Sequence, residues 1–386
     1  MSSTASFFPR VLLGGLVAVL SPFVSAQRDA RQAFDLAVPL APTSYVVDGR
    51  ARLGYELHLT NFAAVPLRLT RVDVFAEDGS TPLVTLSGGA LAASLGRIGP
   101  EAGEDASTLA PGVRAIVYLD LAVDAQTPPA LRHRVEFQST TDGTSARVEG
   151  GRVAPRPAAT RALGAPLRGG PWVAVYSAEW TRGHRRVLYA VDGRARIPGR
   201  HAIDWIKLDA QGGQFAREGK DKRDWYGYGA DVLAVADATV AAVRDDVAEP
   251  VAVSDGNPAV SIGDASGNYV ALALADGRYA FYEHLKPGSI KVRRGERVRR
   301  GDVLAALGYT GQSTGPHLHF HLADAPLPLA AEGLPYAFEG WRPLGAYVSA
   351  EAFGKGGRWS PPENDEPATR AFPAPFAVVE FTSPAR

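Results

Sequence analysis

The stretch GYTGQSTGPHLHFH, from Gly308 to His321, holds three of the eight histidines of this 386-residue chain. His317, His319 and His321 stand two residues apart. Residues at i, i+2 and i+4 of a β-strand share one face, so the spacing predicts a strand with all three imidazoles on one side. Three imidazoles on one face are costly in an apolar core unless each is hydrogen-bonded or bound to metal. The stretch therefore indicates a metal site on a β-sheet, although a purely structural role for the histidines stays open.

Two earlier segments supply polar groups that a metal site needs. FYEHL, from Phe281 to Leu285, places His284 at a strand end, and RHAIDW, from Arg200 to Trp205, places Asp204 between apolar residues. A water-activating zinc site needs three N or O ligands, an open position for water and groups that move protons. Because the chain has no cysteine, any metal must be held by His, Asp or Glu.

Short alternating segments outside this region predict an all-β fold. Apolar and polar residues alternate in four stretches between residues 34 and 150, which are YELHLTNF, LRLTRVDVFA, RAIVYLDLAV and HRVEFQST. Period-two alternation separated by turn residues predicts an immunoglobulin-like antiparallel β-sandwich at 34–150. His58 and His133 stand alone in these strand patterns, so we expect them to be structural.

Amino-acid composition predicts the boundaries of the linker, the second domain and the C-terminal tail. Residues 151–170 are rich in Pro, Ala, Arg and Gly and are predicted to form a linker, followed by a second β-rich domain at 171–350. The Pro-rich stretch 355–386 is predicted to be an irregular tail or an extension packed on the domain. Both domains have enough apolar residues for a core of their own.

The first 26 residues have the pattern of a secretory signal peptide. One Arg precedes an apolar run from Val11 to Leu20, and small residues lead to a cleavage site after Ala26. A retained membrane anchor is the alternative, but the run is shorter than the roughly 20 residues that a span needs. We expect an exported protein, periplasmic or extracellular, with no transmembrane segment after cleavage. The net charge of zero gives no sign of a nucleic-acid partner.

Five segments in order along the chain resemble the motifs of the lysostaphin-like (LytM-type) zinc metallopeptidases of bacterial cell walls. The match covers about residues 199–323, and its segments are GADVLAVAD from Gly229, GNYV from Gly267, YEHL from Tyr282, VRRGDVL from Val298 and GQSTGPHLHF from Gly311. The resemblance implies the family's β-sheet peptidase fold, zinc as cofactor and peptidoglycan peptides as substrate.

The resemblance also implies residue roles. His319 matches the metal-ligand histidine of the family's H-x-H motif, and Asp204 matches its ligand aspartate. His284 and His317 match the two catalytic histidines that orient water and stabilise the oxyanion. We expect His321 to be a surface residue or a partner of these groups, and we prefer the surface position.

The first metal ligand is where the chain departs from the family pattern. The family places a histidine four residues before the aspartate, but here that position is Arg200, and His201 stands three residues before Asp204. We predict His201 as the ligand, provided that a β-bulge turns it toward the site. The alternatives are a displaced ligand, for which His184 is the candidate, or an incomplete site in which Arg200 pairs with Asp204.

An incomplete site would change the class of the protein. The chain would then be a catalytically degenerate module that binds the cell wall or regulates a partner cell-wall hydrolase. A third reading, a carrier domain, lacks a carrier-lysine motif. The sequence does not specify which bond is cleaved or what the N-terminal sandwich does.

Overall fold

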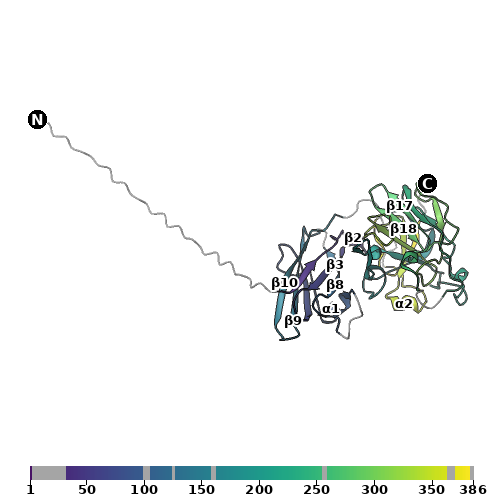
Figure 1. Ribbon diagram of the computed structural model, residues 1–386. Helices are drawn as coiled ribbons and strands as arrows, with labels where there is room; N and C mark the ends of the chain where they lie inside the picture. Colours follow the sequence, from purple (N-terminus) through teal and green to yellow (C-terminus); the bar gives the residue numbers. More distant parts are fainter. Residues whose placement is uncertain are drawn as a thin grey trace. The chain divides into compact units, whose positions relative to one another are not determined.

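Alternating apolar residues in the first part of the chain form two antiparallel β-sheets over one core (Figure 1). One sheet has the order β1-β3-β8-β6 with β2 on β3, and the other has the order β10-β9-β4-β5 with β7 on β4. The first sheet contains β1 (Phe34–Ala37), β2 (Tyr45–Val47), β3 (Arg50–Asn61), β6 (Leu95–Arg97) and β8 (Arg114–Val123). The second contains β4 (Leu67–Ala76), β5 (Val84–Ser87), β7 (Thr108–Leu109), β9 (Leu131–Ser139) and β10 (Ser145–Val153), and α1 (Gly88–Ser94) lies between β5 and β6.

These coordinates are a computed structural model that describes residue 1 and residues 32–98, 105–123, 127–157, 162–253, 259–362 and 370–382. The signal peptide predicted for 1–26 lies outside the described residues except for Met1. Among the residues described, there is no helix with the length and apolar character to cross a membrane. The compact unit that begins at Ala33 contains both the two-sheet sandwich and all later elements.

The second part of the chain is built on a ten-stranded sheet with the order β19-β16-β17-β18-β21-β14-β11-β24-β23, with β22 on β21. Its strands are β11 (Gly169–Val175), β14 (Ile203–Lys207), β16 (Ala238–Arg244), β17 (Tyr269–Leu274), β18 (Tyr279–Glu283), β19 (Arg297–Val298), β21 (Leu318–Ala323), β22 (Gly333–Leu334), β23 (Trp341–Ala346) and β24 (Ala377–Phe381). Two short ribbons pair β12 (Tyr189–Val191) with β13 (Arg194–Arg196) and β15 (Asp231–Leu233) with β20 (Val303–Ala306).

Short helical turns complete the second part. They are α2 (Ala350–Gly354) and the 3₁₀ turns η1 (His184–Arg186), η2 (Pro198–His201), η3 (Lys222–Asp224) and η4 (Ile262–Asp264). The all-β prediction is therefore confirmed for the described residues, since α1 and α2 are only 7 and 5 residues long. The immunoglobulin-like character of the first part stays a prediction.

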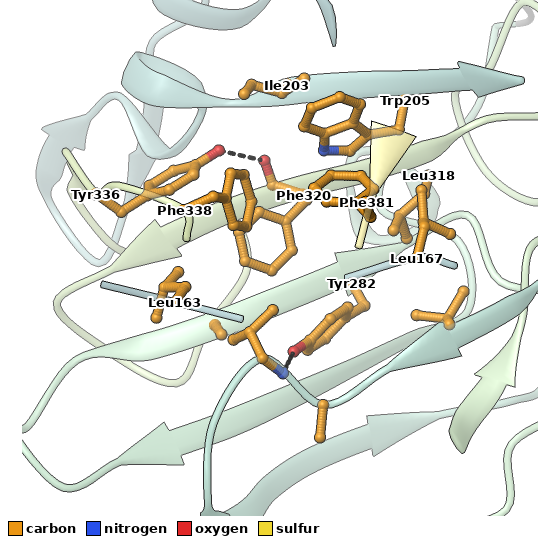
Figure 2. Close-up of a cluster of buried hydrophobic side chains, with 14 of the residues drawn as sticks. Leu163, Leu167, Ile203, Trp205, Tyr282, Leu318, Phe320, Tyr336, Phe338 and Phe381 are labelled. Carbon is orange, nitrogen blue, oxygen red and sulfur yellow. Dashed lines mark hydrogen bonds between the residues drawn. The ribbon is translucent and has the colours of Figure 1, made fainter. Parts of the chain in front are cut away.

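One face of the ten-stranded sheet forms a large aromatic core. Trp205, Phe320 and Tyr282 come from three neighbouring strands and are fully buried on this face (Figure 2). The Tyr282 hydroxyl accepts a hydrogen bond from the Val235 N–H at 2.9 Å, so even the polar end of this ring is satisfied. Because side chains alternate along a strand, Asp204 and His319 must lie on the opposite face. The core thus fixes the direction of the polar side chains.

The predicted linker and tail both contribute to this core. Leu163 and Leu167, inside the predicted linker 151–170, are fully buried. In the tail, β24 inserts between β11 and β23, and Val379 and Phe381 join the core. The prediction of an irregular tail is therefore wrong for Ala377–Phe381, where the run AVVEF forms a strand in the sheet.

His133 and His201 are buried and do not belong to the cluster around Asp204. Their lowered pKa values predict that the protein loses stability in acid. Burial lowers the pKa of His133 to about 4 and that of His201 to about 3. The His133 Nδ1–H donates to the Gly151 carbonyl and its Nε2 accepts from the Tyr55 hydroxyl, which holds the neutral ring. Between about pH 6.5 and these values the unfolded chain binds protons that the folded chain excludes, so stability falls as pH falls.

We expect the free energy of unfolding to drop by about 2 kcal/mol for His133 alone between pH 7 and pH 5. Urea unfolding at the two pH values measures this change. The variant His133→Gln removes the titrating group and should show a drop smaller by about that amount. An equal drop in both proteins would show that His133 is not held neutral.

Candidate metal centre

Pairing of β14 with β21 brings the first two predicted ligands together. Asp204 lies directly opposite His319 in the register, and the pairing is regular from Ile203 to Trp205. The Asp204 Oδ1 lies 2.7 Å from the His319 Nδ1. Two residues 115 positions apart in sequence therefore form one side of a polar cluster, as their resemblance to family ligands implied.

His184 is the third member of this polar cluster and lies next to Asp204. Its Nε2 lies 2.9 Å from the Asp204 Oδ2, and its ring centroid lies 5.2 Å from that of His319. Donor atoms of His184, Asp204 and His319 all fall within 4.8 Å of one another, which suits a shared metal ion. Atoms that share one tetrahedral zinc lie about 3.3 Å apart at usual ligand distances, so small adjustments would fit this set to zinc.

His201, by contrast, lies in a different environment. It ends η2 ahead of β14, and its ring packs against Tyr45 at 5.0 Å and Phe372 at 6.3 Å between centroids. Among the described residues, two groups of side chains could hold a metal ion, and His201 belongs to neither. The pairing of β14 with β21 shows no bulge from Ile203 to Trp205, and His201 precedes the strand, so nothing in the described pairing turns it toward Asp204.

Arg200 does not stand in for a metal charge. Its guanidinium is buried and bonds the carboxylates of Glu56 at 2.9 Å and Glu332 at 3.0 Å. The expectation that Arg200 would pair with Asp204 in an incomplete site is therefore wrong. Its charge is balanced by Glu56 and Glu332, and Asp204 is not among its partners.

His284 and His317 form the other half of the site. Their ring centroids lie 4.8 Å apart, and that of His284 lies 5.8 Å from that of His319. The His284 Nδ1–H donates to the Thr310 carbonyl at 2.8 Å, and the His317 Nδ1–H donates to the Gly315 carbonyl at 2.7 Å. Both rings therefore keep Nε2 free of these backbone contacts, and the His317 Nε2 lies 3.4 Å from Asp204.

The glycine-punctuated loop before β21 fits closely against its neighbours. Gly311 has a φ of +74°, and a Cβ there would approach the Gly267 nitrogen to 2.4 Å. A Cβ on Gly315 would approach the Trp225 ring to 2.5 Å. Glycine is the only residue without this conflict. The loop thereby delivers the Gly315 carbonyl to His317.

Charge on Asp204 dominates the electrostatics of the cluster. Burial would raise the pKa of Asp204, but the imidazoles of His184 and His317 outweigh it and hold the pKa well below its usual value. Burial would likewise lower the pKa of His317, but the Asp204 carboxylate raises it instead. Burial and the neighbouring imidazoles lower the pKa of His284 and of His319. A partly buried carboxylate surrounded by imidazoles is a suitable cation site.

His321 is not the surface residue that we preferred. It shares a face with His319, is 1% exposed and stacks on Phe281 at 4.8 Å between centroids. Burial holds its pKa well below the usual value. Among the described residues neither ring nitrogen has a hydrogen-bond partner.

Backbone geometry also distinguishes the site. His184 and His284 have positive φ values of 38° and 62°, a region that non-glycine residues seldom adopt. Such strain is typical of functional positions. Of the aromatics near the site in sequence, Trp205 belongs to the core, whereas Trp225 packs on Phe215 at 5.0 Å.

A segment in the second part of this sequence is similar to known proteins. Residues 225–329 match Peptidase family M23. The chain is 34% identical over 104 residues to the peptidoglycan DD-endopeptidase ShyB of Vibrio cholerae, covering 24% of this chain and 23% of that protein. It is 40% identical over 79 residues to the glycyl-glycine endopeptidase ALE-1 of Staphylococcus capitis, covering 19% and 21%. The chain thus spans about a quarter or less of the length of these relatives.

Among solved structures, the catalytic domain of lysostaphin from Staphylococcus simulans matches 43% of this chain and 88% of its own, at 18% identity and a TM-score of 0.23. The family match contains His284, His317 and His319, whereas His184 and Asp204 precede it. The match of residues 225–329 to Peptidase family M23 agrees with the metallopeptidase resemblance that the five motifs predicted.

Proposed function

We propose that the chain is a zinc metalloendopeptidase that cleaves peptide bonds of peptidoglycan outside the cytoplasm. The observation that carries the proposal is the convergence of His184, Asp204 and His319 beside the His284–His317 pair. The named relatives are peptidoglycan and glycyl-glycine endopeptidases, which supports a cell-wall peptide as substrate. The predicted signal peptide supports export.

In this proposal His184, Asp204 and His319 hold the zinc. Three protein ligands leave a fourth tetrahedral position for water, which is the arrangement of catalytic rather than structural zinc sites. Bound zinc would lower the pKa of that water and polarise the scissile carbonyl. The donors are two imidazoles and one carboxylate, a set that zinc accepts readily.

His284 and His317 would transfer protons and stabilise the negative charge that develops on the carbonyl oxygen. Each ring is oriented by a backbone carbonyl at Nδ1, so each can present Nε2 to a substrate. The neutral Nε2 of one can take a proton from the attacking water, while the other ring, in its protonated form, donates its Nε2–H to the developing oxyanion. Their placement on two different segments, after β18 and before β21, lets them approach the carbonyl from separate directions.

The degenerate alternative has less support. It required Arg200 to replace the first ligand, and Arg200 is instead bonded to Glu56 and Glu332. We also propose that the two-sheet sandwich at the start of the chain is immunoglobulin-like, because it has two antiparallel sheets over a shared core.

A test of the proposed function measures metal and cleavage in the same preparation. The purified chain should hold one zinc and release peptides from isolated peptidoglycan. The variant His319→Ala loses a ligand, so its activity should fall by more than the 10–100-fold typical of outer-shell changes. His58→Gln, a change at a histidine of the sandwich strand β3, is the control and should retain both properties. Metal-free protein that leaves peptidoglycan intact would refute the proposal.

A further inference from the structure

The turn that carries His184 has few contacts of its own to hold it. Asp204 and His319 are fixed by strand pairing, but His184 begins a 3₁₀ turn of only three residues. Two backbone hydrogen bonds support this turn, from the Arg186 N–H to the Gly183 carbonyl and from the Val187 N–H to the His184 carbonyl. With its φ of 38°, His184 needs surrounding structure to maintain its conformation.

The next residue, Arg185, ties this turn to the N-terminal sandwich. Its side chain is buried, and its Nε donates to the Glu56 Oε1 at 2.8 Å. Its Nη2 donates to the carbonyls of Tyr55 at 2.5 Å and Leu119 at 2.7 Å. All three acceptors belong to strands β3 and β8 of the sandwich. A guanidinium that donates to three acceptors is restricted in both position and orientation.

Arg186 adds a second attachment, to β6 of the same sheet and to α1. Its Nη1 and Nη2 donate to the carbonyls of Leu95 at 3.1 Å and Ala93 at 2.8 Å. Its guanidinium carbon lies 4.1 Å from the centre of the Tyr118 ring. Consecutive residues after His184 therefore both bond to the sandwich.

Glu56 links this turn to η2 as well. Its second oxygen accepts from the Arg200 Nε at 2.9 Å, and Arg200 belongs to η2. The two turns are in close contact, since a Cβ on Gly199 would lie 3.0 Å from the His184 Cα. Burial would raise the pKa of Glu56, but the two guanidiniums lower it to about 2, so the carboxylate stays charged at neutral pH.

We propose that the N-terminal sandwich positions the first metal ligand, with Glu56 acting through Arg185 to hold the turn that presents His184. This inference rests on the proposed function, because it requires His184 to be a zinc ligand. Arg185 and Glu56 are positioning residues and touch neither metal nor substrate. The sandwich is thereby part of what makes the metal centre complete.

The test measures the zinc dissociation constant of the full chain by competition with a chelator. Arg185→Met keeps the length of the side chain but has no donors, and Glu56→Gln keeps an acceptor oxygen without the charge. We expect each variant to bind zinc about 10- to 100-fold more weakly, the range for residues that orient a metal ligand. Arg185→Lys, which restores a charged donor, should recover part of the loss.

A buried carboxylate elsewhere in the sandwich gives a matched control. Asp73 is 2% exposed and accepts from the Arg71 Nε at 2.9 Å and the Thr85 hydroxyl at 2.6 Å. Asp73→Asn should lower the melting temperature and leave the zinc dissociation constant within about twofold of the parent, because general loss of stability does not move the ligand. The absorption spectrum of the Co²⁺-loaded chain should change in Arg185→Met and stay the same in Asp73→Asn.

The outcomes separate this inference from the proposed function. A parent chain that binds no zinc overturns both. A parent that binds zinc and cleaves peptidoglycan, with an unchanged dissociation constant in Arg185→Met and Glu56→Gln, overturns the positioning role alone. If Arg185→Met does not fold, Glu56→Gln decides by the same criterion. Equal weakening in Asp73→Asn would also overturn it.

Discussion

Replacement of His184 by alanine is expected to remove bound zinc and to abolish peptidoglycan cleavage, whereas replacement of His201 by phenylalanine leaves both largely intact. His184 contributes one of three converging donors, with its Nε2 2.9 Å from Asp204. Loss of one ligand leaves two protein groups, fewer than the three that catalytic zinc sites use. We expect activity to fall by more than about 100-fold.

The pair of variants distinguishes His201, which the sequence analysis predicted as the first ligand, from the alternative, His184. His201 packs between Tyr45 and Phe372, so a phenylalanine ring should fill its place. Phenylalanine is larger than histidine, so we expect this change to cost about 1–3 kcal/mol of stability without touching the proposed ligands. Zinc per chain and the rate of peptide release should be measured for both variants. Retention of zinc in His184→Ala together with its loss in His201→Phe would contradict the ligand set.

Replacement of His284 or His317 by alanine is expected to separate zinc binding from catalysis. Two sets of side chains could hold a metal, His184 with Asp204 and His319, or His284 with His317 and His319, and the proposal assigns zinc to the first set. Zinc should therefore remain bound in both variants. Proton transfer by a positioned side chain contributes about 10²–10⁴-fold to rate, and we expect kcat to fall in that range.

The matched control for this second prediction is His133→Gln, which changes a buried histidine of the sandwich bonded to Tyr55 and Gly151. It should lower stability without changing kcat. Zinc content is measured beside kcat in each variant. A fall in activity below tenfold in both His284→Ala and His317→Ala would show that these two rings do not move protons in the reaction.

Much of the sheet could be predicted from periodicity alone. In β14 and β21, apolar residues at alternate positions face the core, so Asp204 and His319 had to share the other face. The same alternation predicted strands in the N-terminal part. These predictions succeed because strand faces depend on local sequence and on the difference between apolar and polar side chains.

Local sequence could not identify His184, the first ligand that we propose. His184 lies 20 residues before Asp204 on a separate turn, and only the packing of η1 on η2 brings it to the cluster. The one available signal was a histidine after a glycine in GHRR, together with an unsuitable Arg200. The family spacing pointed to Arg200, and the neighbouring His201 was predicted only on the assumption of a β-bulge. In the structure His201 belongs to η2, and its ring packs on Tyr45 and Phe372.

His321 and the tail were mispredicted for a related reason. A histidine in an alternating strand can be exposed or buried, depending on what packs on that face of the sheet. Here Phe281 stacks on His321 and buries it. AVVEF in the Pro-rich tail is too short to identify as a strand without its partners β11 and β23. Both depend on contacts distant in sequence.

The ligand set is tested most directly by a crystal structure of the zinc-loaded chain, with the metal located by its anomalous scattering. The prediction is a zinc ion about 2.0–2.2 Å from the His184 Nε2, an Asp204 carboxylate oxygen and the His319 Nδ1, with His284 and His317 beside it but unbound. Zinc bonded to His201, or a zinc-soaked crystal with no metal at Asp204, would contradict the account.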